Sequence, residues 1–132
     1  MSTDAAARVT AVGATIRTAT PDEWDEVADV SYFGFNHGTP DSREPSAERL
    51  TLLRDAEARA ASGDLLVAVD DETGRILGTA SLLRAGSPLT RQSRDGEAEL
   101  RLLAVLPEAR RRGIGRALMV AAIERVARRV LG

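Results

Sequence analysis

Several residue types are scarce in this chain, and each scarcity excludes a kind of chemistry. There is no cysteine, which excludes disulfides, thiol nucleophiles and cysteine-ligated metals. His37 is the single histidine, so we expect no metal site. Aromatic residues make up only 3% of the chain, which leaves Leu, Val, Ile and Ala to fill the core. No apolar run approaches the roughly 18 residues of a membrane span, and residues 1–13 lack the apolar core of a signal peptide, so we expect a cytoplasmic protein.

The charged residues are unevenly distributed. The net charge is −2, and all 18 basic residues are arginines. From Pro107 onward, seven arginines stand against only Glu108 and Glu124, so the remainder of the chain is strongly acidic. A basic C-terminal end on an acidic protein predicts a local anion site rather than general binding to nucleic acid.

The hydrophobic pattern predicts a single α/β domain. A chain of 132 residues with 43% hydrophobic residues is long enough to bury one substantial core. Residues 1–13 are expected to be a flexible tail, and residues 14–132 to form the domain. In chain order, the expected elements are a strand at 14–19, a helix from 20 to about 35, a helix at 46–61, strands at 65–69, 76–83 and 97–105, and a helix at 113–130. The strands on either side of residues 70–75 should form a hairpin, with the helices packed on the sheet.

The last expected helix begins unlike the first. The first helix has Thr20 as a cap, Pro21 in its first turn and acidic residues close by, which suit the positive end of the helix dipole. The last helix instead follows three arginines at 110–112, has Arg116 in its first turn, and has no side-chain acceptor just before Gly113. The arginines therefore lie at the positive end of the helix dipole, where their charge is unfavourable. The first backbone N–H groups of the helix also lack a side-chain acceptor nearby.

A bound anion would resolve these conflicts. It would accept hydrogen bonds from the N–H groups and pair with arginine, and Gly113 and Gly115 would let phosphate oxygens approach the backbone. We therefore predict a phosphate site at residues 110–115. The alternative is a solvated basic loop. The spacing matches neither G-x-x-x-x-G-K-[ST] nor a full dinucleotide fingerprint, because Gly113-Ile-Gly115-Arg-Ala-Leu118 lacks the third glycine.

The string from Ala104 to Leu118 resembles the signature of the GNAT superfamily of acyl-CoA-dependent N-acetyltransferases. That signature, [Arg/Gln]-x-x-Gly-x-[Gly/Ala], follows a strand ending in Ala-Val-x-Pro. Here it reads Ala104-Val-Leu-Pro107 and then Arg110-Arg-Arg-Gly113-Ile-Gly115. The resemblance extends to Ile16-Arg17 before Thr20-Pro21-Asp22, and to Leu66-Val-Ala-Val before Ile76-Leu-Gly-Thr, so that it covers roughly residues 14–131. It implies a GNAT-like mixed sheet flanked by helices.

The resemblance also implies that acetyl-CoA is the cosubstrate and that an amine attacks its thioester directly. In the family, the backbone amides of the signature loop bind the CoA pyrophosphate. Here this assigns to the cofactor Arg110, Arg111, Arg112, Gly113, Ile114, Gly115 and Arg116. Backbone groups at the end of the preceding strand align the pantetheine arm, which assigns Leu103, Ala104 and Val105 to the same site. The reaction needs a base for the ammonium, a polarised thioester carbonyl and a proton for the leaving thiolate.

Glu99 is the candidate base. In histone-acetylating relatives a glutamate at the matching place on the strand has that role, and Glu97 is a weaker competitor. Strand alternation predicts one face made of Glu99, Arg101, Leu103 and Val105, and an opposite face made of Ala98, Leu100, Leu102 and Ala104. The alternative role for Glu99 is an ion pair with Arg101 on a polar face of the sheet.

Two other polar residues have weaker claims on the chemistry. Many family members protonate the thiolate with a tyrosine from a later helix, whereas Tyr32 lies in the first helix, so we expect it to pack in the core or the substrate pocket. His37 lies in the loop after that helix. It either contacts the acceptor or is an ordinary exposed loop residue.

Relative to the family, the chain stops after the third main helix. We therefore expect a domain that is incomplete at its C-terminal end, in which the strand at 97–105 has an open edge. The expected acceptor is the amine of a small molecule or protein, with no nucleic-acid or membrane partner, and a homodimer is one assembly open to the chain. Two rival functions stay open. One is a non-catalytic acyl-CoA-binding or regulatory module that keeps the phosphate loop, and the other is a nucleic-acid or partner-binding domain that uses the arginine-rich last helix.

Overall fold

The computed structural model describes residues 13–91 and 96–131, and only the backbone of residues 130 and 131. The flexible tail expected at residues 1–13 therefore lies, except for Gly13, outside the described residues. The described strands are β1 (Ala14–Thr18), β2 (Gly63–Asp70), β3 (Ile76–Leu83) and β4 (Glu99–Val105). The described helices are η1 (Pro21–Glu23), α2 (Trp24–Gly34), α3 (Ala47–Arg54), α4 (Ala56–Ala61), η2 (Pro107–Arg112) and α5 (Ile114–Leu131), where η marks a short 3-10 helix.

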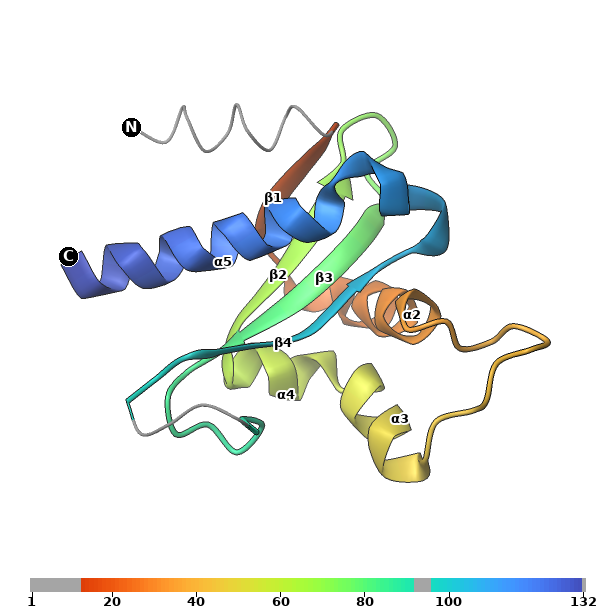
Figure 1. Ribbon diagram of the computed structural model, residues 1–132, viewed down its shortest axis with the longest axis horizontal. Coiled ribbons are helices and arrows are strands. Elements are labelled where there is room, and N and C mark those ends of the chain that lie inside the picture. Colours follow the sequence, from red (N-terminus) through yellow and green to blue (C-terminus); the bar gives the residue numbers. More distant parts are fainter. Residues whose placement is uncertain (1–12, 92–95, 132) are drawn as a thin grey trace.

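The strands form one sheet with helices on both of its faces. Their order is β1-β2-β3-β4, and each neighbouring pair is antiparallel. Figure 1 shows α5 lying across one face, with α2, α3 and α4 on the other. Leu66 of β2 belongs to the core under α5, whereas its neighbours Leu65 and Val67 belong to the core that includes α2. Apolar side chains on both sides explain why β2 is a continuous hydrophobic run. The predicted α/β class is confirmed.

The single helix predicted over residues 46–61 is wrong, because the chain breaks at Asp55. The backbone of Asp55 leaves the helical region, with φ −87° and ψ 69°. Its carboxylate accepts the N–H of Ala58 at 3.0 Å and so caps α4. In the same way, the Ser46 hydroxyl accepts the N–H of Arg49 at 3.1 Å and caps α3. Two capped helices therefore replace one.

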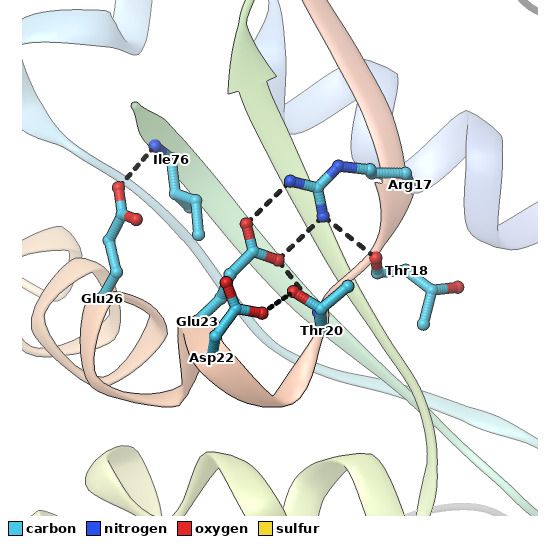
Figure 2. A network of polar contacts seen from close by, with 7 residues as sticks. All are labelled: Arg17, Thr18, Thr20, Asp22, Glu23, Glu26 and Ile76. Atoms are coloured by element: carbon cyan, nitrogen blue, oxygen red, sulfur yellow. Dashed lines mark hydrogen bonds and ion pairs between the residues drawn. The ribbon is translucent and has the colours of Figure 1, made fainter. Parts of the chain in front are cut away.

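The start of α2 is held by an acidic network, which Figure 2 shows. The Glu23 carboxylate accepts two hydrogen bonds from the Arg17 guanidinium, at 2.8 and 2.7 Å, and a third from the N–H of Thr20 at 2.9 Å. Thr20 occupies the predicted cap position, and its hydroxyl donates to Asp22. Glu26 accepts the N–H of Ile76 at 2.8 Å and so joins α2 to β3. The hydrogen bond from Arg17 holds the pKa of Glu23 at about 2.

Strand β4 does not alternate as predicted, because it contains a bulge. Thr79 lies opposite Ala104 and Ser81 lies opposite Arg101, so three steps along β4 match two steps along β3. Leu102, within the bulge, has a φ of +57°. One extra residue exchanges the two faces of a strand. Leu100, Leu103 and Val105 consequently face the core under α5, whereas Arg101 lines a cavity against α3 and α4. The prediction that Glu99, Arg101, Leu103 and Val105 share one face is therefore wrong.

Helix α5 buries only part of its predicted apolar face. Leu118 and Ala122 are buried, but Met119 is 48% exposed and Ile123 is 60% exposed. Ile123 and Val126 line an open apolar groove with Leu100 of β4, which is an edge strand among the described residues. The side chain of Val130, predicted on the same face, lies outside the described part of the chain. In the described ranges, no helix combines the length and the hydropathy that crossing a bilayer requires.

Candidate functional site

The chain passes from β4 to α5 through a tight turn that is fixed to the sheet. The N–H of Leu106 donates to the carbonyl of Leu77 at 2.8 Å, which continues the pairing with β3 by one residue. Proline at position 107 then starts η2, and Gly113 ends it in the left-handed conformation, with φ +77°. Only glycine adopts this conformation without strain. Helix α5 opens with a hydrogen bond from the N–H of Ala117 to the carbonyl of Gly113, at 3.0 Å.

The start of α5 presents backbone donors without an acidic neighbour. The amides of Ile114, Gly115 and Arg116 precede the N–H of Ala117, so helix geometry offers them no carbonyl of an earlier turn. There is no acidic residue in the first turn of α5. The partial positive charge of the helix end is therefore not offset by a carboxylate, as it is at the start of α2. This arrangement can accept an anion.

The four arginines predicted at this site divide into two pairs. Arg110 donates to the carbonyl of Gly34 at 2.7 Å and Arg112 donates to the carbonyl of Gly13 at 2.9 Å, so both side chains hold the turn against other parts of the fold. Arg111 and Arg116 are exposed. Within residues 13–91 and 96–131, no ion pair involves their guanidinium groups. These two side chains can pair with a ligand.

Arg112 also forms an ion pair with Asp70 at the end of β2, with an N–O distance of 2.8 Å. The Asp70 carboxylate accepts the N–H and the hydroxyl of Thr73 at 2.9 and 2.8 Å. Hydrogen bonds from Thr73 and then from Arg112 hold the pKa of Asp70 at about 2. The hairpin turn and the start of α5 are thus joined by a carboxylate that stays charged at neutral pH.

Gly115 is not required by the packing of the protein itself. A Cβ built on it would meet Leu103 at 3.6 Å and Val105 at 3.7 Å, which are ordinary van der Waals distances. The first turn of α5 therefore has room for a methyl group over the end of β4. The residues predicted to hold the pantetheine arm, Leu103, Ala104 and Val105, run directly beneath this point. The structure thus brings the two predicted halves of the cofactor site together.

Glu99 lies at the other end of β4, on the side of the sheet that faces α3 and α4. Its carboxylate accepts the backbone N–H of Arg91, at 2.8 Å to Oε1 and 3.0 Å to Oε2. The predicted pair with Arg101 is not among the described ion pairs, and Arg101 donates to the carbonyl of Leu89 at 3.0 Å. Glu97 is exposed and precedes β4. Glu99 is therefore fixed at the strand, whereas Glu97 is not part of it.

A cavity of about 400 Å³ opens beside this end of β4. It is lined by residues of α3 and α4, of the segment after β3, and of β4, among them Arg49, Asp55, Leu89, Arg91 and Arg101. Burial lowers the pKa of Arg101, and the charges of Arg91 and then Arg49 lower it further. This volume lies within the range of small-molecule sites, about 300–1,000 Å³. The sequence did not single out Arg49 or Arg91, because they belong to different segments that only the fold brings together.

Arg59 of α4 is fully buried close to this cavity, and the sequence analysis missed it. Its Nε donates to the hydroxyl of Ser81 at 2.8 Å and its Nη1 to the hydroxyl of Ser31 at 2.7 Å. Its Nη2 has no hydrogen-bond partner among the described residues. Burial lowers its pKa to about 10, with a further contribution from the charge of Arg49. An arginine between alanines on a short helix gave no sign of its burial.

Tyr32, in the last turn of α2, lies against His37 of the loop that follows the helix. The Tyr32 hydroxyl donates to Glu44, at 2.7 and 2.8 Å to the two carboxylate oxygens, so the expectation of core packing is not met. The hydrogen bond to Glu44 raises the pKa of Tyr32. The His37 ring lies 5.4 Å from the Tyr32 ring, and its Nδ1 is 3.1 Å from the carbonyl oxygen of Arg43. These contacts fix the loop after α2.

The sequence profile of the acetyltransferase (GNAT) family matches residues 23–132. Among solved structures, a Corynebacterium glutamicum protein described as "histone acetyltransferase HPA2 and related acetyltransferase" is 24% identical, with a TM-score of 0.63 over 86% of this chain and 71% of that one. A GNAT family acetyltransferase from Brucella melitensis, in complex with acetyl-CoA, is 25% identical, with a TM-score of 0.60 over 86% of this chain and 68% of that one.

A GCN5-related N-acetyltransferase from Kribbella flavida is also similar. It is 25% identical, with a TM-score of 0.60 over 89% of this chain and 67% of that one. Against these three structures the chain spans between 67% and 71% of the relative's length. No curated protein matches the chain.

Proposed function

Because the chain belongs to the acetyltransferase (GNAT) family, we propose that it is an N-acetyltransferase in which a primary amine directly attacks the thioester of acetyl-CoA. The start of α5 carries this proposal. A helix start without an acidic residue, two arginines without described partners and a glycine that the packing does not require all favour a bound pyrophosphate there. The solved Brucella relative contains acetyl-CoA, which supports the same cosubstrate here.

We propose that the backbone of the turn and of the first turn of α5 binds the pyrophosphate, through residues Arg110, Arg111, Arg112, Gly113, Ile114, Gly115 and Arg116. Arg111 and Arg116 contribute charge, whereas Arg110 and Arg112 contribute by holding the turn in place through Gly34 and Asp70. The pantetheine arm then follows the backbone of Leu103, Ala104 and Val105. As β4 is an edge strand among the described residues, one side of its backbone is not paired with β3 and can bind the arm.

Glu99 is the proposed base. It takes a proton from the ammonium of the acceptor, and the amine nitrogen then forms a C–N bond with the acetyl carbon while the C–S bond breaks. The second nitrogen proton leaves as the CoA thiolate is protonated, so free CoA and the acetylated amine are the products. The Glu99 carboxylate accepts a hydrogen bond from the N–H of Arg91, a residue that lines the cavity, and a carboxylate of this kind can serve as a general base.

Release of free CoA thiol from acetyl-CoA across a panel of amines tests this proposal, after calorimetry has measured the binding of acetyl-CoA. Replacing Glu99 with Gln should reduce kcat by about 100-fold, the lower end of typical general-base effects, and leave the Kd of acetyl-CoA nearly unchanged. The pH–rate profile should lose its acidic limb. Glu97→Gln is the matched control and should keep wild-type kcat. Binding of acetyl-CoA without release to any amine would favour a non-catalytic module.

A further inference from the structure

Four arginine side chains gather on the face of the sheet that α3 and α4 cover. Arg49, Arg91 and Arg101 line the cavity beside β4. Arg59 is buried next to it, since the preceding residue, Ala58, is also part of the cavity wall. Ser81, which accepts a hydrogen bond from Arg59, pairs across the sheet with Arg101. The charges are close enough to act on one another, because Arg49 lowers the pKa of both Arg59 and Arg101.

Among the described residues, no carboxylate lies within ion-pair distance of these four arginines. In the described part of the chain, the ion pairs involve other arginines, such as Arg17 and Arg112. Natural proteins seldom bury an arginine without a carboxylate partner, because desolvation of the charge is costly. Arg59 nevertheless has hydroxyl partners only, and its Nη2 has no partner. Three arginines of the cavity wall, Arg49, Arg91 and Arg101, outnumber its two acidic residues, Glu48 and Asp55.

The acidic residues near the cavity have other roles. The Asp55 carboxylate caps α4 through the N–H of Ala58. Glu48 is exposed on the first turn of α3, where an acid suits the helix dipole. Glu99 accepts the N–H of Arg91. None of these carboxylates forms a described ion pair with Arg49 or Arg101. The Arg49 guanidinium lies over the Phe35 ring and Arg101 donates one hydrogen bond to the carbonyl of Leu89, contacts that leave both charges without a carboxylate partner.

We propose that this cavity binds the carboxylate of a small acceptor amine, so that the preferred acceptor is an amino acid or a similar amino carboxylate. The inference rests on the proposed transferase function and specifies its substrate class. A carboxylate held by Arg49 and Arg101 would place the amine of the same molecule toward Glu99, two residues before Arg101 on β4. The positive charges of these arginines would repel a polyamine. A volume of about 400 Å³ suits one small molecule.

A panel of matched acceptors tests the substrate class. The common amino acids, the corresponding amino acid amides and spermidine would be compared by release of CoA thiol from acetyl-CoA. An amide keeps the amine and side chain but removes the negative charge. We expect kcat/KM to be at least about tenfold higher for the best amino acid than for its amide, the effect of one charge-assisted pair. Equal or better turnover of the amides or of spermidine would overturn the inference.

Variants of Arg49 and Arg101 test whether these two side chains bind the carboxylate of the acceptor. Arg49→Gln and Arg101→Gln should each raise KM for the amino acid by about tenfold and leave kcat/KM for the amide near the wild-type value. Arg128→Gln, an exposed arginine in the last turn of α5, is the control and should change neither substrate. Thermal unfolding of each variant verifies folding. An equal loss with acid and amide would mean that these arginines do not recognise the carboxylate.

Direct binding separates this inference from the proposed function. Calorimetry would measure the binding of an N-acetylated amino acid and of its amide to the chain in the presence of CoA. Binding of the acid alone, without turnover of any amine, would defeat the transferase proposal and keep the carboxylate site. Turnover of neutral amines without preferential binding of the acid would keep the transferase and remove the carboxylate site.

Discussion

Helices α2 and α5 start in similar sequence contexts but with opposite charge. Each follows a strand, and each is preceded by a short 3-10 helix with proline in its first turn, η1 for α2 and η2 for α5. The η1 segment carries two acidic residues, and α2 carries two more in its first turn. The η2 segment ends in three arginines, and the first turn of α5 has no acidic residue. The backbones differ in that Gly113, in the left-handed conformation, separates η2 from α5, whereas α2 follows η1 directly. The charges differ as well, and with them the partners of the two helix ends.

The start of α2 finds its partners within the chain. The Glu23 carboxylate accepts hydrogen bonds from Arg17 and from the N–H of Thr20, and Figure 2 shows that Arg17 of β1 and Ile76 of β3 connect the helix start to the sheet. At the start of α5, Arg110 and Arg112 fix the turn, whereas Arg111 and Arg116 form no ion pair among the described residues. If the proposed function holds, the start of α2 uses its charges for stability and the start of α5 uses its charges for binding.

The largest effect should follow from placing a carboxylate at the start of α5, where it should weaken the binding of acetyl-CoA. Gly113→Glu puts negative charge and bulk where the pyrophosphate would lie, and like-charge repulsion of a few kcal/mol should weaken acetyl-CoA binding by about 100-fold or more. Isothermal calorimetry measures this directly. Any non-glycine residue is also strained at the left-handed backbone of Gly113, so a control for strain is needed.

Gly86→Glu supplies that control. Gly86 has φ +79°, and a Cβ there would meet nothing within 4 Å, so the substitution introduces the same charge and a similar strain in the loop after β3. Its affinity for acetyl-CoA should equal that of the wild type. Undiminished affinity in Gly113→Glu, or equal loss in both variants, would remove the phosphate site from the start of α5.

At the start of α2, removing the carboxylate of Glu23 should reduce the stability of the protein and leave its binding of acetyl-CoA unchanged. The pKa of Glu23 is about 2, below its unfolded value of 4.5, so its ion pair stabilises the folded state above about pH 4.5 and this contribution is lost as the pH falls toward 2. Arg17 is 41% exposed, so solvent screening reduces the effect. Glu23→Gln should lower the free energy of unfolding by about 1–2 kcal/mol at pH 7.

Urea unfolding of Glu23→Gln at several pH values measures this contribution. The difference from the wild type should shrink between pH 4.5 and 2, and acetyl-CoA affinity at pH 7 should stay the same. Asp25→Asn, an exposed acid in the first turn of α2, is the matched control and should change stability by less than about 0.5 kcal/mol. A pH-independent loss in Glu23→Gln would assign its effect to packing.

The elements that the sequence predicted well are those governed by local pattern. Strand β3 ends where the turn residues around it indicate, and the start of α5 follows from glycine and arginine spacing. Asp55 could be taken for an ordinary polar residue of a helix, because an aspartate becomes a cap only if the chain bends there. The α/β fold and the site of the signature were therefore predictable, whereas one helix break was not.

The face assignments failed for a different reason. Leu102 adopts a positive φ, which leucine seldom does. The sequence therefore does not predict a bulge at this position. That single extra residue separates Glu99 and Arg101 from Leu103 and Val105. The contacts of Arg110 with Gly34, and of Arg59 with Ser31 and Ser81, join residues far apart in the chain. Contacts of this kind depend on tertiary structure and cannot be deduced from spacing.

The smallest effect offers the sharpest comparison, because it should move stability and binding in opposite directions. Arg116→Glu gives the start of α5 the kind of charge that the start of α2 already has. An acid in the first helical turn should stabilise the fold by about 0.3–1 kcal/mol. The same charge should repel the pyrophosphate and weaken acetyl-CoA binding by about tenfold. Thermal unfolding and calorimetry on the same sample measure both quantities.

Arg128→Glu reverses charge at the other end of α5 and completes the comparison. An acid near the C-terminal end of a helix opposes the dipole, so this variant should be slightly less stable than the wild type, with unchanged affinity for acetyl-CoA. A stabilised Arg116→Glu with weakened binding would show that the arginines at the start of α5 are kept for a ligand at the expense of the fold. If Arg116→Glu is instead destabilised and binds normally, the basic start of α5 is an ordinary solvated surface.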